Sequence, residues 1–229
     1  MKIVTIIGAR PQFIKAGSVS REISRRADQG RDIHEIILHT GQHYDANMSD
    51  IFFAEMQIPQ PDYSLGIGNV SHGAMTGQMI EKIENVLIHE MPDIVIVYGD
   101  TNSTLAGALA AAKLNISIAH VEAGLRSFNL QKPEEINRIL TDRVSRLLFC
   151  PTQTAIDNLM NEGCDAWQTG AKMIFSGDVM RDSAIYYRKL ARSPGNISLA
   201  REFVLCTIHR QENIDDSGRL ANIMDALNE

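Results

Sequence analysis

The stretch KIVTIIGARPQFIK, residues 2–15, decides the fold of this chain. An apolar strand at residues 3–7 runs directly into a glycine, and Arg10, Pro11 and a helix that carries Lys15 follow. Pro11 suits the first position of a helix, and Lys15 lies one turn further along the same face. We expect the backbone N–H groups of the turn and the two cations to meet where an anion such as a phosphate binds. The competing interpretation is that Arg10 and Lys15 are ordinary surface charges.

Beyond this stretch, apolar runs of strand length alternate with longer segments of helical period. The predicted strands are residues 3–7, 33–39, 94–98, 116–121 and 147–150, and the predicted helices are residues 13–26, 49–56, 73–90, 103–114, 152–161 and 182–191. This alternation favours an α/β, Rossmann-like domain with a parallel sheet covered by helices on both faces. Ligands of such sheets bind outside the carboxyl ends of the strands. No G-x-G-x-x-G motif follows the first strand, which argues against a dinucleotide cofactor.

The composition is that of a globular protein and argues against several partners. The 229 residues are 44% hydrophobic and 22% charged, with 22 basic residues against 28 acidic ones and a net charge of −6. These values fit one substantial domain or two small ones, and no run of Lys or Arg points to nucleic acid. No apolar run approaches the roughly 20 residues that span a membrane, and the first one is too short for a signal peptide. We therefore expect a cytoplasmic protein.

The cysteines do not indicate a metal site or a disulfide framework. Cys150, Cys164 and Cys206 are odd in number and lack metal-ligand spacing. Because Cys150 and Cys206 lie in or beside apolar runs, we expect reduced, buried thiols rather than a catalytic thiol.

A second unit begins late in the chain. Residues 193–198 are rich in Ser, Pro, Gly and Asn, as in a linker, and residues 203–208 predict another strand. A helix follows at residues 215–229, with Asp215 or Asp216 as its N-cap. One strand and one helix bury no core of their own, so they belong to an incomplete domain or fold back onto the first. The predicted division is a Rossmann-like domain at 1–192, a linker at 193–202 and a truncated second Rossmann-like domain at 203–229.

Polar residues that follow the predicted strands are candidates for function, but each has a structural alternative. His43 ends the segment TGQH, where it binds a substrate hydroxyl or only satisfies its own loop. Asp100 precedes an Ala-rich helix and would stabilise it by about 1 kcal/mol if it were merely the N-cap. Glu122 follows a buried strand, where a carboxylate is costly unless it is paired, and the structural alternative is that Arg126 is its partner.

Two further clusters lie later in the chain. Glu134 and Glu135 stand at a predicted helix start, where the helix dipole favours anions without any catalytic role. His209 and Arg210 end the predicted strand of the second unit, on the side of the cleft if two sheets oppose each other.

Six motifs occur together in a fixed order: GARPQFIK, TGQH, YGDTNSTLAGALAA, HVEAGLRS, PEEINR and IHRQEN. In order and spacing they resemble the non-hydrolysing UDP-N-acetylglucosamine 2-epimerase family, and the resemblance covers residues 2–229. It implies a two-domain fold of the GT-B type, with two Rossmann-like halves and the active site in the cleft. The chain then corresponds to the first half plus the first strand and helix of the second.

The resemblance also implies a reaction. The family eliminates UDP across C1–C2 of a UDP-sugar to give a glycal, and then adds UDP back with a proton on the other face. Carboxylates move the protons and cations hold the diphosphate, without a metal or a nicotinamide cofactor. The implied catalytic residues are Asp100, Glu122, Glu134 and His209. The candidate substrate-binding residues are Arg10, Lys15, His43, Arg138, Arg210, Glu212 and Asn213. A homodimer is the expected assembly.

Two departures from the family pattern narrow the resemblance. Many members have Thr-Arg-Pro-Glu where residues 9–12 of this chain read ARPQ. This form, with SFN at 127–129, resembles the branch that acts on UDP-2,3-diacetamido-2,3-dideoxyglucuronate, whose product serves surface polysaccharide. A UDP-sugar-dependent GT-B glycosyltransferase and a non-catalytic fragment are the alternatives, and we expect the 229-residue chain alone to be inactive.

Overall fold

The computed structural model describes the chain except for residues 42–58, 69, 194, 196–201, 209–210 and 229. The chain forms two compact units, Met1–Leu190 and Ala191–Glu229. The elements of the first unit are β1 (Lys2–Ile7), α1 (Arg10–Asp28), β2 (His34–His39), β3 (Tyr63–Ser64), α3 (His72–Glu90), β4 (Ile94–Tyr98), α4 (Asn102–Lys113), β5 (Ser117–Val121), α5 (Pro133–Val144), β6 (Leu147–Cys150), α6 (Gln153–Asn161), η1 (Cys164–Ala166), β7 (Lys172–Phe175) and α7 (Val179–Arg188). Those of the second unit are α8 (Gln211–Ile214) and α9 (Ser217–Asn228).

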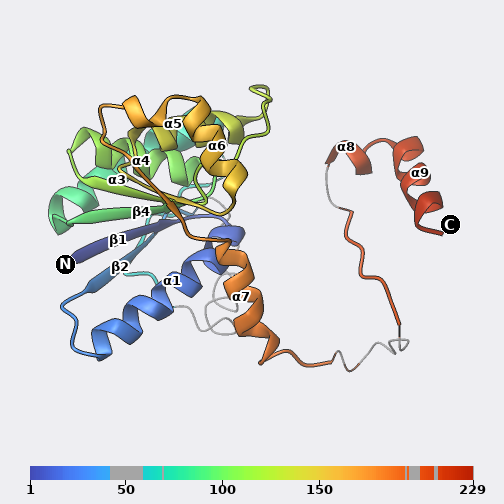
Figure 1. The fold of residues 1–229 in the computed structure, drawn as a ribbon, viewed down its shortest axis with the longest axis horizontal. Helices are drawn as coiled ribbons and strands as arrows, with labels where there is room; N and C mark the ends of the chain where they lie inside the picture. Colours follow the sequence, from blue (N-terminus) through green and yellow to red (C-terminus); the bar gives the residue numbers. More distant parts are fainter. Residues whose placement is uncertain (42–58, 69, 194, 196–201, 209–210, 229) are drawn as a thin grey trace. The chain divides into compact units, whose positions relative to one another are not determined.

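The first unit is built on a seven-stranded, wholly parallel sheet in the order β3-β2-β1-β4-β5-β6-β7 (Figure 1). The strand order reverses between β1 and β4, and a ligand of such a sheet binds at the carboxyl ends beside this reversal. The predicted Rossmann-like class is confirmed, as are the five predicted strands of this domain. Strands β3 and β7 were not predicted.

The two faces of the sheet are covered by different helices (Figure 1). Side chains alternate along β1, so that Val4 and Ile6 pack in a core with α3 and α4, whereas Ile3 and Ile7 pack against α1 on the other face. Helix α7 lies on α1. The nearly continuous burial of β1 and β4 follows from this double cover.

In the second unit, the prediction of a strand at residues 203–208 is wrong, because the structure assigns no strand there. Phe203, Val204 and Leu205 are 58%, 88% and 84% exposed. A strand requires a neighbour that accepts its hydrogen bonds, and no described residue pairs with this segment. Cys206 is exposed as well, which corrects the expectation that it is buried.

Other predictions are confirmed. Cys150 and Cys164 are buried free thiols. Asp216 is the N-cap of α9, because its Oδ1 accepts a hydrogen bond from the backbone N–H of Arg219 at 3.0 Å. The predicted helix at residues 49–56 lies outside the described residues. Within the described part of the chain, no helix combines the length and the apolar character that crossing a bilayer requires.

Candidate active site

The turn between β1 and α1 is tied together by a buried glutamine. Gln12 Oε1 accepts hydrogen bonds from the N–H groups of Gly8 and Ala9 at 2.8 and 2.9 Å. Its Nε2 donates to the carbonyl oxygen of Tyr98 at 2.9 Å and to Oγ1 of Thr104 at 3.0 Å. The expectation that these two N–H groups bind an anion is therefore wrong, because Gln12 already occupies them. The side chain instead fixes the start of α1 to the end of β4.

Lys15 and Glu122 form an ion pair at the carboxyl edge of the sheet, with side chains 12% and 21% exposed. Glu122 has a positive φ of 74°, which is uncommon for a residue with a side chain and is typical of functional sites. Its N–H and that of Ala123 both donate to the carbonyl oxygen of Phe149, at 3.1 and 3.0 Å. Gly99 packs beside the pair: a Cβ there would lie 3.1 Å from Lys15 Nζ and 3.2 Å from Glu122 Oε2.

The interpretation of Arg126 as the partner of Glu122 is wrong. The Arg126 side chain is 1% exposed and turns away, donating to Asp142 Oδ2 at 2.7 Å and to Glu162 Oε1 at 2.6 Å. Glu122 is paired instead with a lysine 107 positions away in the sequence, so spacing along the chain gave no signal for the contact.

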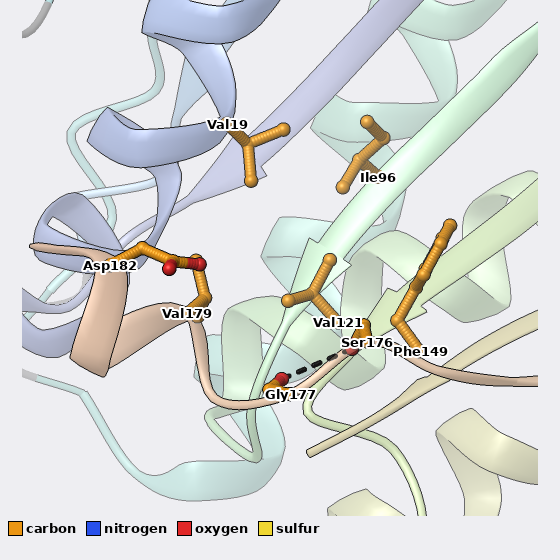
Figure 2. Close-up of a pocket in the computed structure, with 8 residues that line it drawn as sticks. All are labelled: Val19, Ile96, Val121, Phe149, Ser176, Gly177, Val179 and Asp182. Atoms are coloured by element: carbon orange, nitrogen blue, oxygen red, sulfur yellow. Dashed lines mark hydrogen bonds between the residues drawn. The ribbon is translucent and has the colours of Figure 1, made fainter.

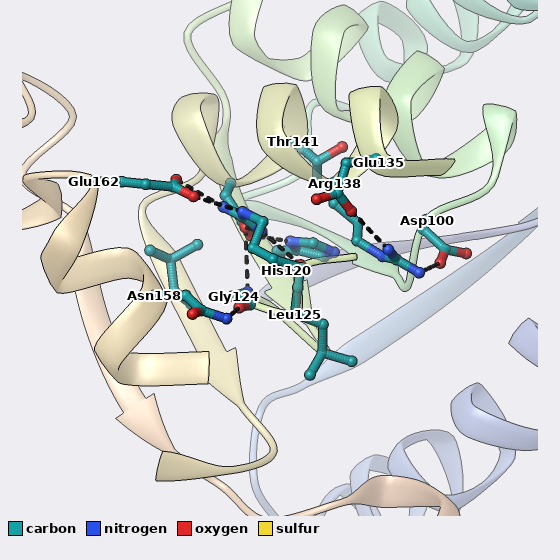
Figure 3. A network of polar contacts seen from close by, with 12 residues as sticks. Asp100, His120, Gly124, Leu125, Glu135, Arg138, Thr141, Asn158 and Glu162 are labelled. Atoms are coloured by element: carbon teal, nitrogen blue, oxygen red, sulfur yellow. Dashed lines mark hydrogen bonds and ion pairs between the residues drawn. The ribbon is translucent and has the colours of Figure 1, made fainter. Parts of the chain in front are cut away.

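Asp100 is not the N-cap of α4. Thr101 is, because its Oγ1 accepts a hydrogen bond from the N–H of Thr104 at 3.3 Å. The Asp100 carboxylate accepts from Arg138 Nη2 at 2.5 Å (Figure 3). The structural alternative for Asp100 is thus overturned, and the aspartate is left with a partly exposed carboxylate held by one arginine.

Arg138 also binds Glu135, so that it bridges two carboxylates (Figure 3). Burial would raise the pKa of Glu135, but hydrogen bonds from the N–H groups of Ser127 and Phe128 and from Arg138 hold it below its ordinary value. Burial would lower the pKa of Arg138, but the charges and hydrogen bonds of Asp100 and Glu135 together raise it above its ordinary value. The charged forms of Glu135 and Arg138 are therefore the favoured ones.

Asp100 and Glu134 line one pocket at the carboxyl edge of the sheet, among the starts of α1, α3, α4 and α5. Its lining residues are Ala9, Pro11, His72, Asp100, Thr101, Asn102, Pro133, Glu134 and Asn137. Asn137 Nδ2 donates to the carbonyl oxygen of Asp100 at 2.8 Å, and Asn102 Nδ2 lies 3.1 Å from His72 Nδ1. Two predicted catalytic carboxylates thus line a common space together with the hydrogen-bonding side chains of His72, Asn102 and Asn137.

His72, Asn102 and Asn137 are among the pocket residues that sequence reasoning did not name as site residues. Asn102 and Asn137 lie inside the motifs YGDTNSTLAGALAA and PEEINR, so the motifs carried a signal that was not used. His72 lies in none of the six motifs, and only the fold brings α3 to the site.

A second pocket lies between α1, α7 and the sheet face under them (Figure 2). Val19, Ile96, Val121 and Phe149 form apolar walls, and Asp182 supplies the one carboxylate of its lining. None of the predicted site residues that the structure describes lines it. One carboxylate without a second acid or base is poorly suited to a reaction that needs proton transfer at two faces.

Arg10, Glu212 and Asn213 are the remaining predicted site residues that the structure describes. Arg10 is exposed at the first position of α1. His43, His209 and Arg210 lie outside the described residues. Glu212 and Asn213 belong to α8 in the second unit. Among the described residues, no group of three His, Cys, Asp or Glu side chains could hold a metal ion.

Solved structures with the same arrangement are epimerases. A crystal structure of the Methanocaldococcus jannaschii UDP-GlcNAc 2-epimerase, in complex with UDP-GlcNAc and UDP, aligns with a TM-score of 0.84 at 44% identity, over 99% of this chain and 62% of that one. The Neisseria meningitidis UDP-GlcNAc 2-epimerase bound to UDP-GlcNAc aligns with a TM-score of 0.74 at 34% identity, over 83% and 49% of the two chains. These likenesses confirm the predicted fold as the first half of a GT-B type protein.

Sequence comparison agrees. The UDP-2,3-diacetamido-2,3-dideoxy-D-glucuronate 2-epimerase of Pseudomonas aeruginosa is 58% identical over 229 residues, which are 100% of this chain and 63% of the relative. A UDP-N-acetylglucosamine 2-epimerase of Methanocaldococcus jannaschii is 43% identical over 234 residues, 99% of this chain and 62% of the relative. The chain thus spans less than two thirds of these proteins. Residues 25–229 match the family model for UDP-N-acetylglucosamine 2-epimerase, and the chain therefore belongs to that family.

Proposed function

We propose that the complete protein inverts C2 of a UDP-activated 2-acetamido sugar. The observation that carries the proposal is the pairing of carboxylates with cations at one edge of the sheet: Lys15 with Glu122 and Arg138 with Asp100. Glu134, exposed in the pocket that Asp100 also lines, adds a third carboxylate. The family membership and the UDP-sugars bound in the solved relatives support the same reaction.

The reaction proceeds by elimination and re-addition. A carboxylate removes the C2 proton, the electron pair of that C–H bond becomes the C1=C2 double bond of a glycal, and the C1–O bond to UDP breaks. Re-addition of UDP to C1 is accompanied by protonation of C2 from the opposite face, so no oxidant or metal enters the balance. Asp100, Glu122 and Glu134 are the proposed acid and base groups, together with His209.

Cations hold the departing diphosphate in this proposal. Arg10 and Lys15 lie at the start of α1, and Arg138 lies one turn into α5. Their role is to stabilise the negative charge that develops on UDP as the C1–O bond breaks. His43, Arg210, Glu212 and Asn213 complete the proposed substrate contacts, the last three from the second domain.

The proposed substrate is the 2,3-diacetamido uronate derivative. This choice is supported by the 58% identity with the Pseudomonas aeruginosa enzyme of that name. The identity is 54% with a Methanococcus maripaludis protein named as a UDP-N-acetylglucosamine 2-epimerase homolog and 43% with the Methanocaldococcus jannaschii enzyme. The product would then supply surface polysaccharide. Assays of the complete protein with both UDP-sugars test the choice, and a higher kcat/KM for UDP-N-acetylglucosamine would reverse it.

We also propose that the protein works in the cytoplasm as a homodimer. Its proposed substrates are nucleotide sugars, and its proposed domains are a Rossmann-like domain at 1–192, a linker at 193–202 and the beginning of a second Rossmann-like domain at 203–229. Sedimentation of the complete protein at several concentrations tests the dimer, which a persistent monomer would exclude.

Solvent exchange tests the reaction itself. The complete protein is incubated with the UDP-sugar in deuterium oxide, and both epimers are examined by NMR. We expect deuterium at C2 of both, because the removed proton exchanges with solvent. Retention of protium at C2 through many turnovers would exclude proton abstraction there. A requirement for an acceptor, with transfer of the sugar to it, would instead indicate a glycosyltransferase.

A further inference from the structure

His120 is a fully buried histidine of β5 that the proposed reaction does not use. Its Nδ1 lies 2.6 Å from Asp142 Oδ1, and its Nε2 lies 2.7 Å from the carbonyl oxygen of Gly99 (Figure 3). Both ring nitrogens therefore face oxygen atoms at hydrogen-bond distance.

The acceptors on its two sides determine its protonation. A carbonyl oxygen only accepts, so Nε2 must carry a hydrogen to bond Gly99. Asp142 already accepts from Arg126 Nη1 at 2.7 Å and from the N–H of Gly124 at 3.2 Å, which is the environment of an ionised carboxylate. Burial would raise the pKa of Asp142, but the charges and hydrogen bonds of His120 and Arg126 hold it below its ordinary value. Nδ1 must then carry a hydrogen too.

The surrounding charges balance an imidazolium. Asp142 from α5 lies between two cations, His120 and Arg126, and Arg126 is also bound to Glu162 at the end of α6. Cys150 of the neighbouring strand stays a neutral thiol, because burial raises its pKa to about 12. The buried charges thus pair with one another and, through Arg126, with the Glu162 carboxylate, which is 33% exposed, and such pairing is the condition under which buried charge is tolerated.

His120 connects the segments that carry Asp100 and Glu122, the two carboxylates of the site that are paired with cations. Through Nε2, His120 holds the peptide of Gly99, the residue immediately before Asp100. Two residues after His120 comes Glu122, whose partner Lys15 lies against Gly99.

We propose that His120 is a buried imidazolium that positions Asp100 and Glu122 relative to each other, with Asp142 as its counter-ion. The proposal rests on the proposed function, because it assigns those two carboxylates to the reaction. His120 touches no substrate in this role and acts only through its two hydrogen bonds.

Its ionisation is tested without any activity measurement. In the complete protein labelled with ¹⁵N-histidine, two-bond ¹H–¹⁵N correlation separates a neutral ring, whose two nitrogens differ widely in shift, from an imidazolium, whose nitrogens are alike. The His120 signal, assigned by its absence from His120→Gln, should show two protonated nitrogens at neutral pH. One protonated and one bare nitrogen would overturn the proposal whether or not the protein is an epimerase.

The positioning role of His120 is tested by two variants, each of which keeps a hydrogen-bond donor near one of the two ring nitrogens. His120→Gln keeps an N–H donor near the place of Nε2, whereas His120→Asn keeps one near Nδ1. We expect kcat to fall by about 10²-fold or more in His120→Asn, because misplacement of about 1 Å has costs of that size. The fall in kcat should be smaller in His120→Gln, by a factor of about ten or more. KM should change little in either variant. Equal kcat in the two variants would exclude positioning through Gly99.

Leu87→Ala is the matched control. It removes a buried side chain of α3 from the core on one face of the sheet, a core to which His120, Arg126 and Asp142 do not belong. We expect Leu87→Ala to lose as much thermal stability as the histidine variants and to keep the wild-type kcat. This result would show that instability alone does not lower turnover. If Leu87→Ala lowers kcat as much as His120→Asn, the proposal fails. Wild-type protein inactive on both UDP-sugars would contradict the proposed function alone.

Discussion

Glu134 and Glu135 are consecutive in α5 but have opposite environments. Glu134 is exposed on the pocket, whereas Glu135 is 1% exposed and accepts hydrogen bonds from Ser127, Phe128 and Arg138. The motif PEEINR therefore contains one carboxylate free to meet a substrate and one that fixes the preceding loop.

Replacing these two carboxylates should separate turnover from stability. Glu134→Gln removes a group that can carry a proton and should lower kcat by at least about 10²-fold without changing thermal unfolding. Glu135→Gln removes the charge from a buried acceptor and should destabilise by about 1.5–3 kcal/mol, the range for hydrogen bonds to charged groups. Kinetics and denaturant unfolding of both variants are the measurements. Wild-type turnover in Glu134→Gln would contradict its assignment.

Variants of Asp100 and Thr101 should also separate a loss of turnover from a loss of stability. Asp100→Asn should lower kcat by at least about 10²-fold, with an unchanged far-UV spectrum, because Thr101 caps α4. Thr101→Ala should cost about 1 kcal/mol of stability and serves as the control for loss of the cap. If Asp100→Asn is instead active but less heat-stable, Asp100 is structural. Glu122→Gln should behave as Asp100→Asn does.

The fold was largely predictable because buried parallel strands are apolar along their whole length. Strands β1, β2, β4, β5 and β6 were found in this way. Strand β7 was missed because it is short and mostly exposed, with the sequence KMIF and an exposed lysine and phenylalanine at its ends. At residues 203–208 the same criterion predicted a strand wrongly, because an apolar run forms a strand only where a neighbouring strand is present to pair with it.

The site was predictable in position but not in its contacts. Asp100 and Glu122 follow strands, and the carboxyl ends of parallel strands always share one edge. Which cation meets which carboxylate depends on the direction of each side chain across elements far apart in sequence, as for Lys15 with Glu122. Local spacing therefore favoured the wrong partner, Arg126.

Gly99 should be essential for the Lys15–Glu122 pair. Gly99→Ala imposes a side chain at φ +64° and places its Cβ within 3.2 Å of both charged groups. We expect about 1–2 kcal/mol of destabilisation from the backbone alone and roughly a 10²-fold loss of kcat from displacement of the pair. Gly170→Ala has a similar φ, +60°, with nothing within 4 Å of the added Cβ, and should show the stability loss with normal turnover. Equal kcat in the two variants would exclude this role.

Glu35 should make stability depend on pH. Burial raises its pKa above the ordinary 4.5, although Thr5 and Ser20 donate hydrogen bonds to it. The folded state therefore binds its proton more tightly than the unfolded state, so this contribution is complete below pH 4.5 and is lost as pH rises through the folded pKa. Relative to wild type, Glu35→Gln should gain stability as pH rises from about 4.5 to 7.

The control for Glu35 is Glu22→Gln. The exposed Glu22 carboxylate is bound by Arg25 and Arg26, whose hydrogen bonds lower its pKa to about 2. It is ionised in both states at neutral pH, so its replacement should shift the unfolding curves by a constant amount between pH 6 and 7. Denaturant unfolding across the pH range gives both results. A pH-independent difference between Glu35→Gln and wild type would contradict the prediction.

The first unit should fold without the second. The three buried cores lie within residues 1–190, whereas α9 contributes no buried residue to the chain. We therefore expect residues 1–190 to unfold cooperatively, at the same midpoint as residues 1–229, in denaturant experiments on both.

Neither piece should act as an enzyme, because the chain spans less than two thirds of its relatives and the proposed roles of His209 and Arg210 need the rest of a second domain to hold these residues. Titration of residues 1–229 with UDP should show a Kd weaker than about 1 mM, which corresponds to less than about 4 kcal/mol of binding free energy. Residues 1–190 should bind equally weakly, since Lys15 and Arg138 are already held by Glu122 and Asp100. Micromolar UDP binding or turnover by either piece would mean that the nucleotide site lies wholly within the first unit.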